Sequence, residues 1–238
     1  MKNAANENNT PMEGVCLLDP SRMAGTRERL RSGDEGLARS LRNLCERADE
    51  AMQTAPYSVM DKRAIPPSGD KHDYMSLGTY WWPNPDTPDG LPYIRRDGER
   101  NPEGYELDHS RIVKLCRDCS ILAYAFYFTG NSAYSKQAVS LLRAWFLDPD
   151  TRMNPHLNYA QSIPGICEGR DIGIIDTSTR FPGLLDAIGI LRSSGEMPSS
   201  TFDGLMAWMN EYLNWLLDSP NGRGEASQKN NHGTWHDA

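Results

Sequence analysis

The sequence predicts an all-α fold, built from pairs of helices that are joined by long irregular loops. Apolar residues recur at spacings of three and four in several segments, which is the period of an amphipathic helix. No segment shows the alternating pattern that a half-buried strand would require. With 238 residues, of which 38% are hydrophobic, the chain is long and apolar enough for one globular domain.

The N-terminus differs from the rest of the chain. Residues 1–13 are rich in Asn and have no apolar period, so we expect them to be disordered. The ordered domain is expected over residues 14–238. Met1 to Thr10 is polar and lacks an apolar core, so we expect no signal peptide in this chain.

The first helical pair has clear start and stop signals. Asp19-Pro20 combines a capping residue with Pro at the first helical position, and Gly33 marks the end of this helix near Arg31. Asp34 then opens a second helix. One face of this second helix carries apolar residues at helical spacing, namely Leu37, Leu41, Leu44 and Ala48.

Two further pairs follow. Asp108 is expected to cap a helix that runs to Gly130, and a partner helix runs from Ser132 to just before Asp148-Pro149. The apolar stripe of the first of these helices consists of Ile112, Leu115, Cys119, Leu122 and Phe126. The third pair is predicted over 177–191 and 199–217. Three such pairs indicate a curved array of hairpins with a cleft at one rim.

The loops between the pairs carry most of the aromatic and polar side chains. Residues 54–107 hold Tyr80, Trp81 and Trp82, whose rings can stack on the apolar faces of sugars. Loops this long are usually functional or disordered, and the aromatics argue against disorder. Residues 148–177 hold polar groups that can recognise hydroxyls and carboxylates, namely Asn154, His156, Asn158, Tyr159, Gln161 and Arg170.

The last segment is the candidate for chemistry. Ser219 to Ser227 is expected to be a Gly-containing loop that leads into Asn230-Asn231-His232. Asn favours caps, so these residues are expected at a helix start. An amide donates to a carboxylate, and His exchanges its proton near neutral pH. This pairing suits an acidic substrate, whereas the alternative is a solvated cap.

Charge and cysteine usage exclude several classes. The net charge of −7 argues against a nucleic-acid binder, although Arg95, Arg96 and Arg100 form either a local cationic site or a solvated loop. The apolar run 121–128 is too short to span a bilayer. The five cysteines do not form a disulfide framework, and Cys116 and Cys119 are best explained by packing.

No metal or cofactor is expected. His236 follows His232 by four residues, so that both rings would share one helix face and could bind a metal. Asp237 is the one obvious candidate for a third ligand, so a stacking or solvated His236 is the favoured interpretation.

Several motifs, in order along the chain, resemble the alginate lyase superfamily of polysaccharide lyases from about Val15 to the end. They are Lys71-His72-Asp73-Tyr74-Met75-Ser76-Leu77, Tyr80-Trp81-Trp82-Pro83-Asn84-Pro85, Gly90-Leu91-Pro92-Tyr93-Ile94-Arg95-Arg96-Asp97-Gly98, Asn101-Pro102-Glu103, Asn158-Tyr159-Ala160-Gln161-Ser162-Ile163-Pro164-Gly165, Gly169-Arg170 and Asn230-Asn231-His232. The resemblance implies an α/α toroid, an incomplete barrel of antiparallel helical hairpins. Proteins of this family usually work in the periplasm or outside the cell, but no signal peptide is visible in this sequence, so the compartment stays open.

The activity implied by the resemblance is β-elimination on alginate or a related polyuronate. The proton on C5 is removed and the oxygen on C4 is expelled. By motif position, Asn231 and His232 are expected to neutralise the substrate carboxylate, with His232 as an alternative base for one epimer. The expected substrate-binding residues are Tyr80, Trp81, Trp82, Tyr159, Gln161 and Arg170. The partner is thus an acidic polysaccharide, with neither nucleic acid nor membrane.

The family pattern also includes a Tyr that moves the proton and an Arg, both expected some tens of residues after the Asn-His pair. This chain ends at Ala238, so we expect it to lack that C-terminal part or to use substitutes. Tyr80, Tyr93 and Tyr159 are the candidate tyrosines, and Arg170 is the candidate arginine. Two other functions stay open, namely a carbohydrate-binding protein without catalysis and a helical scaffold for protein partners.

Overall fold

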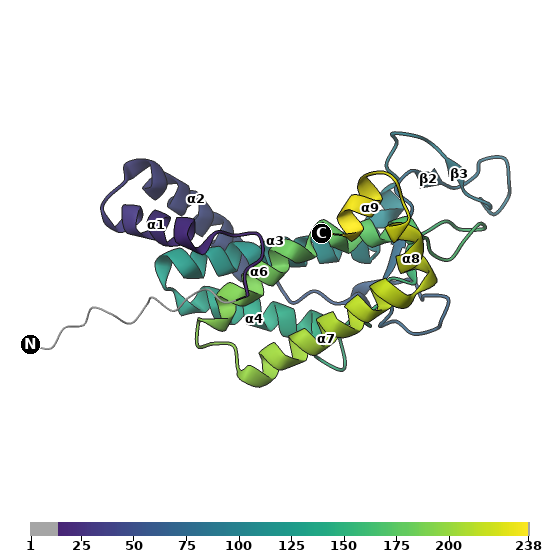
Figure 1. The fold of residues 1–238 in the computed structure, drawn as a ribbon. Helices are drawn as coiled ribbons and strands as arrows, with labels where there is room; N and C mark the ends of the chain where they lie inside the picture. The colour runs from purple at the N-terminus through teal and green to yellow at the C-terminus, as the bar shows by residue number, and fades with distance from the viewer. Residues whose placement is uncertain (1–13, 238) are drawn as a thin grey trace, which may run out of the picture. The chain divides into compact units, whose positions relative to one another are not determined.

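The computed structural model describes residues 14–237, and these are predominantly helical. The expected disorder of residues 1–13 lies outside the described residues. The α-helices are α1 (Pro20–Arg31), α2 (Glu35–Met52), α3 (Asp108–Thr129), α4 (Ser132–Phe146), α5 (Ile175–Ser178), α6 (Phe181–Arg192), α7 (Ser199–Asp218), α8 (Pro220–Ala226) and α9 (Asn231–His236). Short 3-10 helices are η1 (Val59–Asp61), η2 (Pro102–Glu106) and η3 (Asp171–Ile174). Figure 1 shows their order along the chain.

The chain divides into two compact units. Unit one comprises residues 14–55, Cys116–Ser140 and Pro182–Phe202. Unit two comprises Pro56–Leu115, Leu141–Phe181 and residues 203–237. No helix within residues 14–237 has the length and apolar character needed to cross a membrane.

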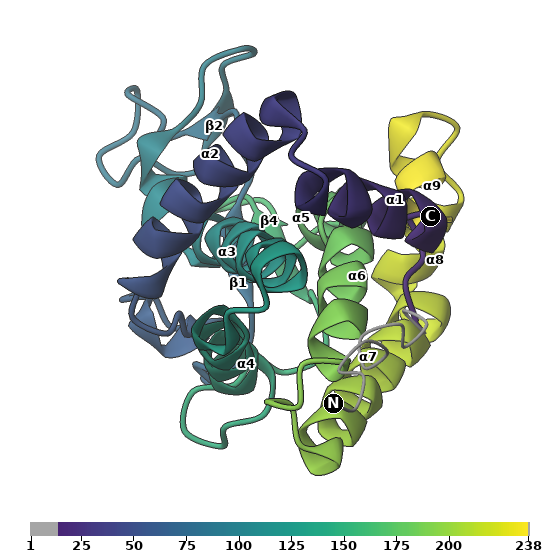
Figure 2. The ribbon, with the colours of Figure 1, turned by 90° about the vertical axis from the view of Figure 1, so that its left-hand side faces the viewer.

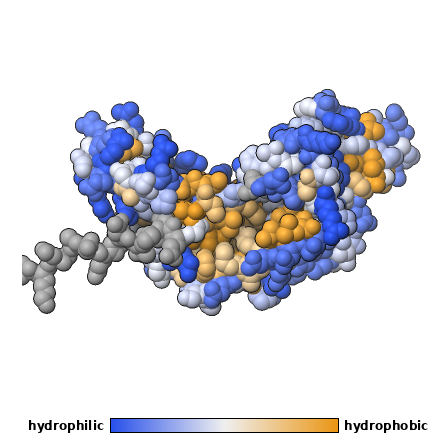
Figure 3. Space-filling view, in the orientation of Figure 1, coloured by the Kyte–Doolittle hydropathy of each residue, from blue (hydrophilic) through white to orange (hydrophobic). Residues whose placement is uncertain are grey.

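In unit one, the first predicted helical pair is confirmed at both starts. The Asp19 carboxylate accepts hydrogen bonds from the backbone N–H groups of Ser21 and Arg22, and Pro20 occupies the first turn of α1. The Asp34 carboxylate caps α2 through the N–H of Leu37. Figure 2 shows α1 and α2 joined by a tight turn, and Figure 3 shows a largely hydrophilic surface over them. Accordingly, α1 has no buried residue.

Unit two has a compact aromatic core. The ring of Trp208 lies 4.6 Å from that of Phe146 in an edge-to-face contact. Phe181 contacts Trp208 and Tyr212 edge-on, and Trp208 stacks on Tyr212 at 5.6 Å. The indole N–H of Trp208 donates to the Met153 carbonyl, so this ring is anchored as well as buried.

Short strands in the loops of unit two were not predicted. β1 (Met75–Leu77) pairs in parallel with β4 (Tyr159–Ser162), and β2 (Trp81–Trp82) pairs antiparallel with β3 (Ile94–Arg95). Strands of two to four residues are too short to show an alternating pattern in the sequence. The β1–β4 pair fixes the loops 54–107 and 148–177 against each other, whereas β2 and β3 both lie within residues 54–107.

The predicted loop over Ser219 to Ser227 is wrong, because this segment forms α8. Ser219 caps the helix through the N–H of Gly222, and Pro220 occupies its first turn. The two glycines that suggested a loop are there for close packing. A Cβ on Gly222 would lie 1.8 Å from the Leu216 carbonyl oxygen, and one on Gly224 would lie 2.8 Å from the Asp171 Cβ.

Two other boundaries differ from prediction. The helix expected from residue 177 is broken, since α5 ends at Ser178 and α6 begins at Phe181. Asp108 is the first residue of α3, but its carboxylate bonds outside that helix. It accepts from the backbone N–H of Met75 at 2.9 Å and pairs with the Lys62 ammonium at 3.0 Å.

The Lys62–Asp108 pair is fully buried. Both side chains have 0% exposure, and Lys62 also donates to the carbonyls of Val59 and Lys71. Burial raises the pKa of Asp108 to about 6, against the opposing charge of Lys62. Burial also lowers the pKa of Lys62. This pair ties the loop after Pro56 to the start of α3.

Replacing Lys62 by Met should strongly destabilise the protein. The variant leaves the Asp108 carboxylate buried beside no cation, which typically costs about 3–5 kcal/mol. Urea denaturation followed by circular dichroism would measure the loss. The double variant K62M/D108N should recover part of it, because no buried charge remains; a double variant as unstable as K62M would contradict this account.

The pair also predicts a pH dependence. The folded-state pKa of Asp108 is raised to about 6, above the unfolded value of about 3.9. The folded state therefore binds this proton more tightly, and its stabilisation is lost as the pH rises through this window. Relative to Asp108→Asn, the wild type should lose on the order of 3 kcal/mol between pH 4 and pH 7. Urea midpoints across this range would measure it, and a constant difference between the two proteins would refute it.

Candidate active site

A cavity of about 400 Å³ in unit two gathers five of the eight predicted site residues. Its lining residues are Thr79, Tyr80, Trp81, Arg95, Gln161, Arg170, Ile172, Ile175 and His232. They come from the β2–β3 loop region, β4, η3, α5 and α9. Asn231, Trp82 and Tyr159 are the predicted site residues that do not line it.

His232 is placed by a cap at the start of α9, as the sequence predicted. The Asn230 side chain accepts a hydrogen bond from the His232 backbone N–H at 2.9 Å. The His232 ring nitrogen Nδ1 lies 2.9 Å from Oε1 of Glu225 on α8. Figures 1 and 2 both show α8 and α9 side by side. The other ring nitrogen, Nε2, is therefore the one available to a ligand in the cavity.

Asn231 does not accompany His232 into the cavity. Its side chain is exposed, and it belongs to the first turn of α9 without lining the cavity. Adjacent residues on a helix point about 100° apart, so a shared direction was not to be expected once the segment is helical. The role of Asn231 as a carboxylate donor stays a prediction.

Gln161 occupies a strained position beside the cavity. Its φ of 48° lies in the left-handed region, which is uncommon for a residue other than Gly. Four hydrogen bonds hold it. Its backbone N–H donates to Ser76 Oγ at 2.7 Å, and its side-chain amide donates to Asp176 Oδ1 at 3.1 Å. Its two oxygens accept from Arg170.

Arg170 brings a positive charge to the cavity. Its Nε donates to the Gln161 carbonyl at 2.9 Å and its Nη2 to Gln161 Oε1 at 2.8 Å. Both partners are neutral, and Arg170 forms no ion pair within the described part of the chain. Burial lowers the pKa of Arg170, and the charge of Arg95 also lowers it. Three nearby groups act in the opposite direction, namely Cys167, Asp171 and Asp176. An anion in the cavity would compensate both the burial of the Arg170 guanidinium and its repulsion from Arg95.

The two tryptophans of β2 have different environments. Trp81 lines the cavity. Trp82 donates its indole N–H to the Glu99 carbonyl and lies under the Arg96 guanidinium at 5.2 Å. Successive residues of a strand face opposite sides, which explains the split. Of the three clustered arginines, Arg95 lines the cavity, where it also pairs with the exposed Asp97.

The three candidate tyrosines also separate. Tyr80 lines the cavity. Tyr159 is half-buried, and its ring lies 6.5 Å from that of His156. The Tyr93 hydroxyl donates to Glu103, and burial together with that carboxylate raises the pKa of Tyr93 to about 12. Tyr80 is therefore the tyrosine best placed to meet a ligand beside His232.

Metal-binding residues are not grouped in the described region. Within residues 14–237 there is no set of three or more His, Cys, Asp or Glu side chains arranged to hold a metal. His236 has a ring nitrogen 3.4 Å from the Asp237 carboxylate. Cys119 is buried, and this burial raises the pKa of its thiol well above the usual range.

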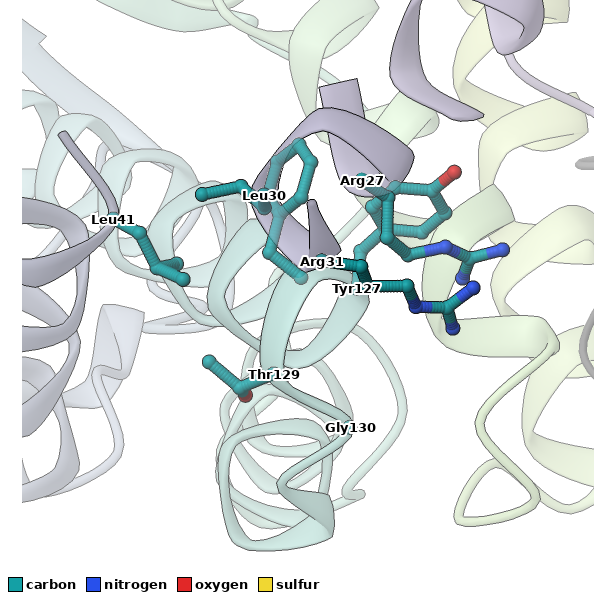
Figure 4. Close-up of a pocket in the computed structure, with 8 residues that line it drawn as sticks. Arg27, Leu30, Arg31, Leu41, Tyr127, Thr129 and Gly130 are labelled. Atoms are coloured by element: carbon teal, nitrogen blue, oxygen red, sulfur yellow. The ribbon is translucent and has the colours of Figure 1, made fainter. Parts of the chain in front are cut away.

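A second cavity, of about 340 Å³, lies in unit one. It is lined by Arg27, Leu30, Arg31, Leu41, Tyr127, Phe128, Thr129 and Gly130. Arg27 stacks on the Tyr127 ring at 4.7 Å, and Figure 4 shows the guanidinium groups of Arg27 and Arg31 pointing the same way. This lining contains no carboxyl, imidazole or amide side chain. Of these side chains, Tyr127 is the one of a type that acid–base catalysis uses, and its ring stacks under Arg27.

Two residues of the first site were missed by sequence reasoning. Glu225 lies in a segment that was expected to be a loop, and Asp176 lies just before a helix that was expected to begin at residue 177. Both carboxylates are buried and bond to residues of the cavity wall. A single acidic residue near a helix boundary is common in any sequence, so the sequence alone could not show that these two carboxylates contact the cavity wall.

Comparison with known proteins agrees with this architecture. A comparison with curated protein sequences gives no match. A solved alginate lyase from Bacteroides ovatus superposes with a TM-score of 0.88 at 39% sequence identity. The match covers 96% of this chain and 59% of that one, so the chain spans 59% of the length of that lyase. The predicted all-α toroid is confirmed. The family model for alginate lyases matches residues 58–238, and the chain belongs to the alginate lyase family.

Proposed function

We propose that this chain acts on alginate or a related polyuronate as a polysaccharide lyase. The reaction removes the C5 proton of a uronate and breaks the bond between C4 and the glycosidic oxygen. A C4–C5 double bond forms, and the leaving oxygen takes up a proton. The observation that carries the proposal is the cavity where His232, Arg170, Gln161, Tyr80 and Trp81 meet.

The charge of the cavity supports elimination next to a carboxylate. A C5 proton beside an ionised carboxylate is very weakly acidic, so the negative charge that develops must be stabilised. Arg170 supplies a guanidinium without an ionic partner among the described residues. Arg95 supplies a second positive charge on the same lining, although it also pairs with the exposed Asp97. Nε2 of His232 can donate a hydrogen bond when the ring is protonated on both nitrogens. The site thus selects an acidic sugar over a neutral one.

Tyr80 is our candidate for moving the proton. Tyr80 belongs to the same lining as His232 and Arg170, whereas the Tyr93 hydroxyl is engaged with Glu103. As phenolate it would take the C5 proton, and as phenol it would return that proton to the leaving oxygen. Trp81 is placed to stack on a sugar ring.

The direct test uses the chain with polymannuronate, polyguluronate and glucuronan. Elimination gives an unsaturated uronate, whose ultraviolet absorbance rises with time. Arg170→Gln and His232→Ala should each lower the rate by about a hundred- to a thousandfold, because each removes a donor to the developing charge. Arg223→Gln removes an exposed arginine of α8 and serves as the matched charge control. Asn231→Ala in the same assay tests the predicted donor outside the cavity.

Absence of product from all three polymers would reject the lyase proposal for this chain. Calorimetric titration of the same polymers would then decide the alternative function. Binding without product would support a non-catalytic carbohydrate-binding protein. Loss of that binding in Arg170→Gln, with retention in Arg223→Gln, would place the glycan in the cavity.

Tyr80→Phe should abolish most turnover while keeping substrate affinity. The substitution removes the hydroxyl and keeps the ring, so the general base is lost, typically at a cost of about 10²–10⁴-fold. Steady-state kinetics would show the loss in kcat with little change in KM. Tyr93→Phe, outside the cavity lining, is the control. Equal rates for wild type and Tyr80→Phe would exclude Tyr80 as the base.

A further inference from the structure

The carboxylate of Glu225 is fully buried, and one of its two oxygens has no hydrogen-bond partner in the described part of the chain. Its side chain has 0% exposure, and Oε1 is bonded to Nδ1 of His232. Oε2 has no hydrogen-bond partner among residues 14–237. Burying a carboxylate is costly unless a charge or hydrogen bonds compensate it. The described structure offers one direct compensation, which is the imidazole of His232.

Several neighbouring groups act on the pKa of the Glu225 carboxyl, and the His232 imidazole is the main one that lowers it. Burial raises the pKa of Glu225, while the hydrogen bond and the charge of His232 lower it. Asp171, on η3, raises this pKa further, and His236 lowers it. Glu225 thus lies between one carboxylate and two imidazoles, with His232 as the nearest.

The backbone keeps the two groups together. Asn230 fixes the first turn of α9 through the His232 N–H. Gly233 lies so close to the preceding turn that a Cβ there would be 2.1 Å from the Gln228 carbonyl oxygen. Gly222 and Gly224 fix α8 against Leu216 and Asp171 in the same way. These contacts hold the backbones of α8 and α9 in the places from which the carboxylate meets the ring.

We propose that Glu225 is a positioning residue, which holds His232 with a proton on Nδ1 so that Nε2 faces the substrate. The inference rests on the proposed function for its catalytic meaning. An acceptor at Nδ1 fixes the tautomer and the ring orientation, as in catalytic triads.

The tautomer can be measured without any turnover. The probe is the full chain labelled with ¹⁵N-histidine, with His232 assigned from the signals lost in His232→Gln. At pH of about 8 to 9 an ordinary imidazole is neutral. The expected spectrum shows His232 protonated at Nδ1 and bare at Nε2. In Glu225→Gln, whose amide can donate as well as accept, a bare-Nδ1 population should appear. A bare Nδ1 in the wild type, or an unchanged spectrum in the variant, would overturn the proposal.

Kinetics supply the second measurement. Glu225→Gln should lower kcat by about 10²–10⁴-fold, as expected when a catalytic histidine loses the acid that fixes its tautomer. KM should change little, because Glu225 does not line the cavity. Asp218→Asn is the matched control, since it removes an exposed carboxylate at the end of α7. Full activity in Glu225→Gln would overturn the proposal. An inactive wild type that still shows the Nδ1-protonated tautomer would reject the lyase function while leaving the positioning of His232 intact.

Discussion

The candidate site depends on one buried carboxylate, that of Asp176. It accepts the hydroxyls of Tyr74 at 3.0 Å and Ser76 at 2.6 Å, and the Gln161 amide at 3.1 Å. Ser76 lies in β1, Gln161 lies in β4 and Tyr74 directly precedes β1, so the parallel strand pair and α5 share one acceptor. Such a network is strong because it is fully satisfied and excluded from water. The network also offsets the conformational cost of the left-handed backbone at Gln161. Gln161 in turn orients Arg170 through two hydrogen bonds.

A second carboxylate, that of Glu225, plays a comparable part on the opposite wall. Asp176 reaches the cavity through the amide of Gln161, and Glu225 reaches it through the imidazole of His232. In both cases the buried acid stays out of the lining, and a residue between it and the cavity meets the ligand. The lining itself therefore carries Arg95 and Arg170 and no carboxylate, in a protein with net charge −7.

Much of the fold was predictable because its signals are local. Asp19-Pro20 and the cap at Asn230 depend on residues within one turn, and the structure places both helix starts as predicted. The strands and α8 were missed, because two-residue strands have no period and glycines lower helix propensity even where packing requires them. The site was predicted in part. His232, Gln161 and Arg170 carry recognisable chemistry, whereas Glu225 and Asp176 act through contacts that only the folded chain creates.

The glycines around α8 and α9 have a consequence for how the protein can vary. At positions 222, 224 and 233 a single methyl group would meet backbone or a neighbouring side chain at well under normal contact distance. Another part of the cavity wall comes from the segment that contains the paired strands β2 and β3, through Trp81 and Arg95. Natural drift or laboratory evolution should therefore reshape ligand preference through that segment, while the glycine-packed turn beneath His232 tolerates almost no change.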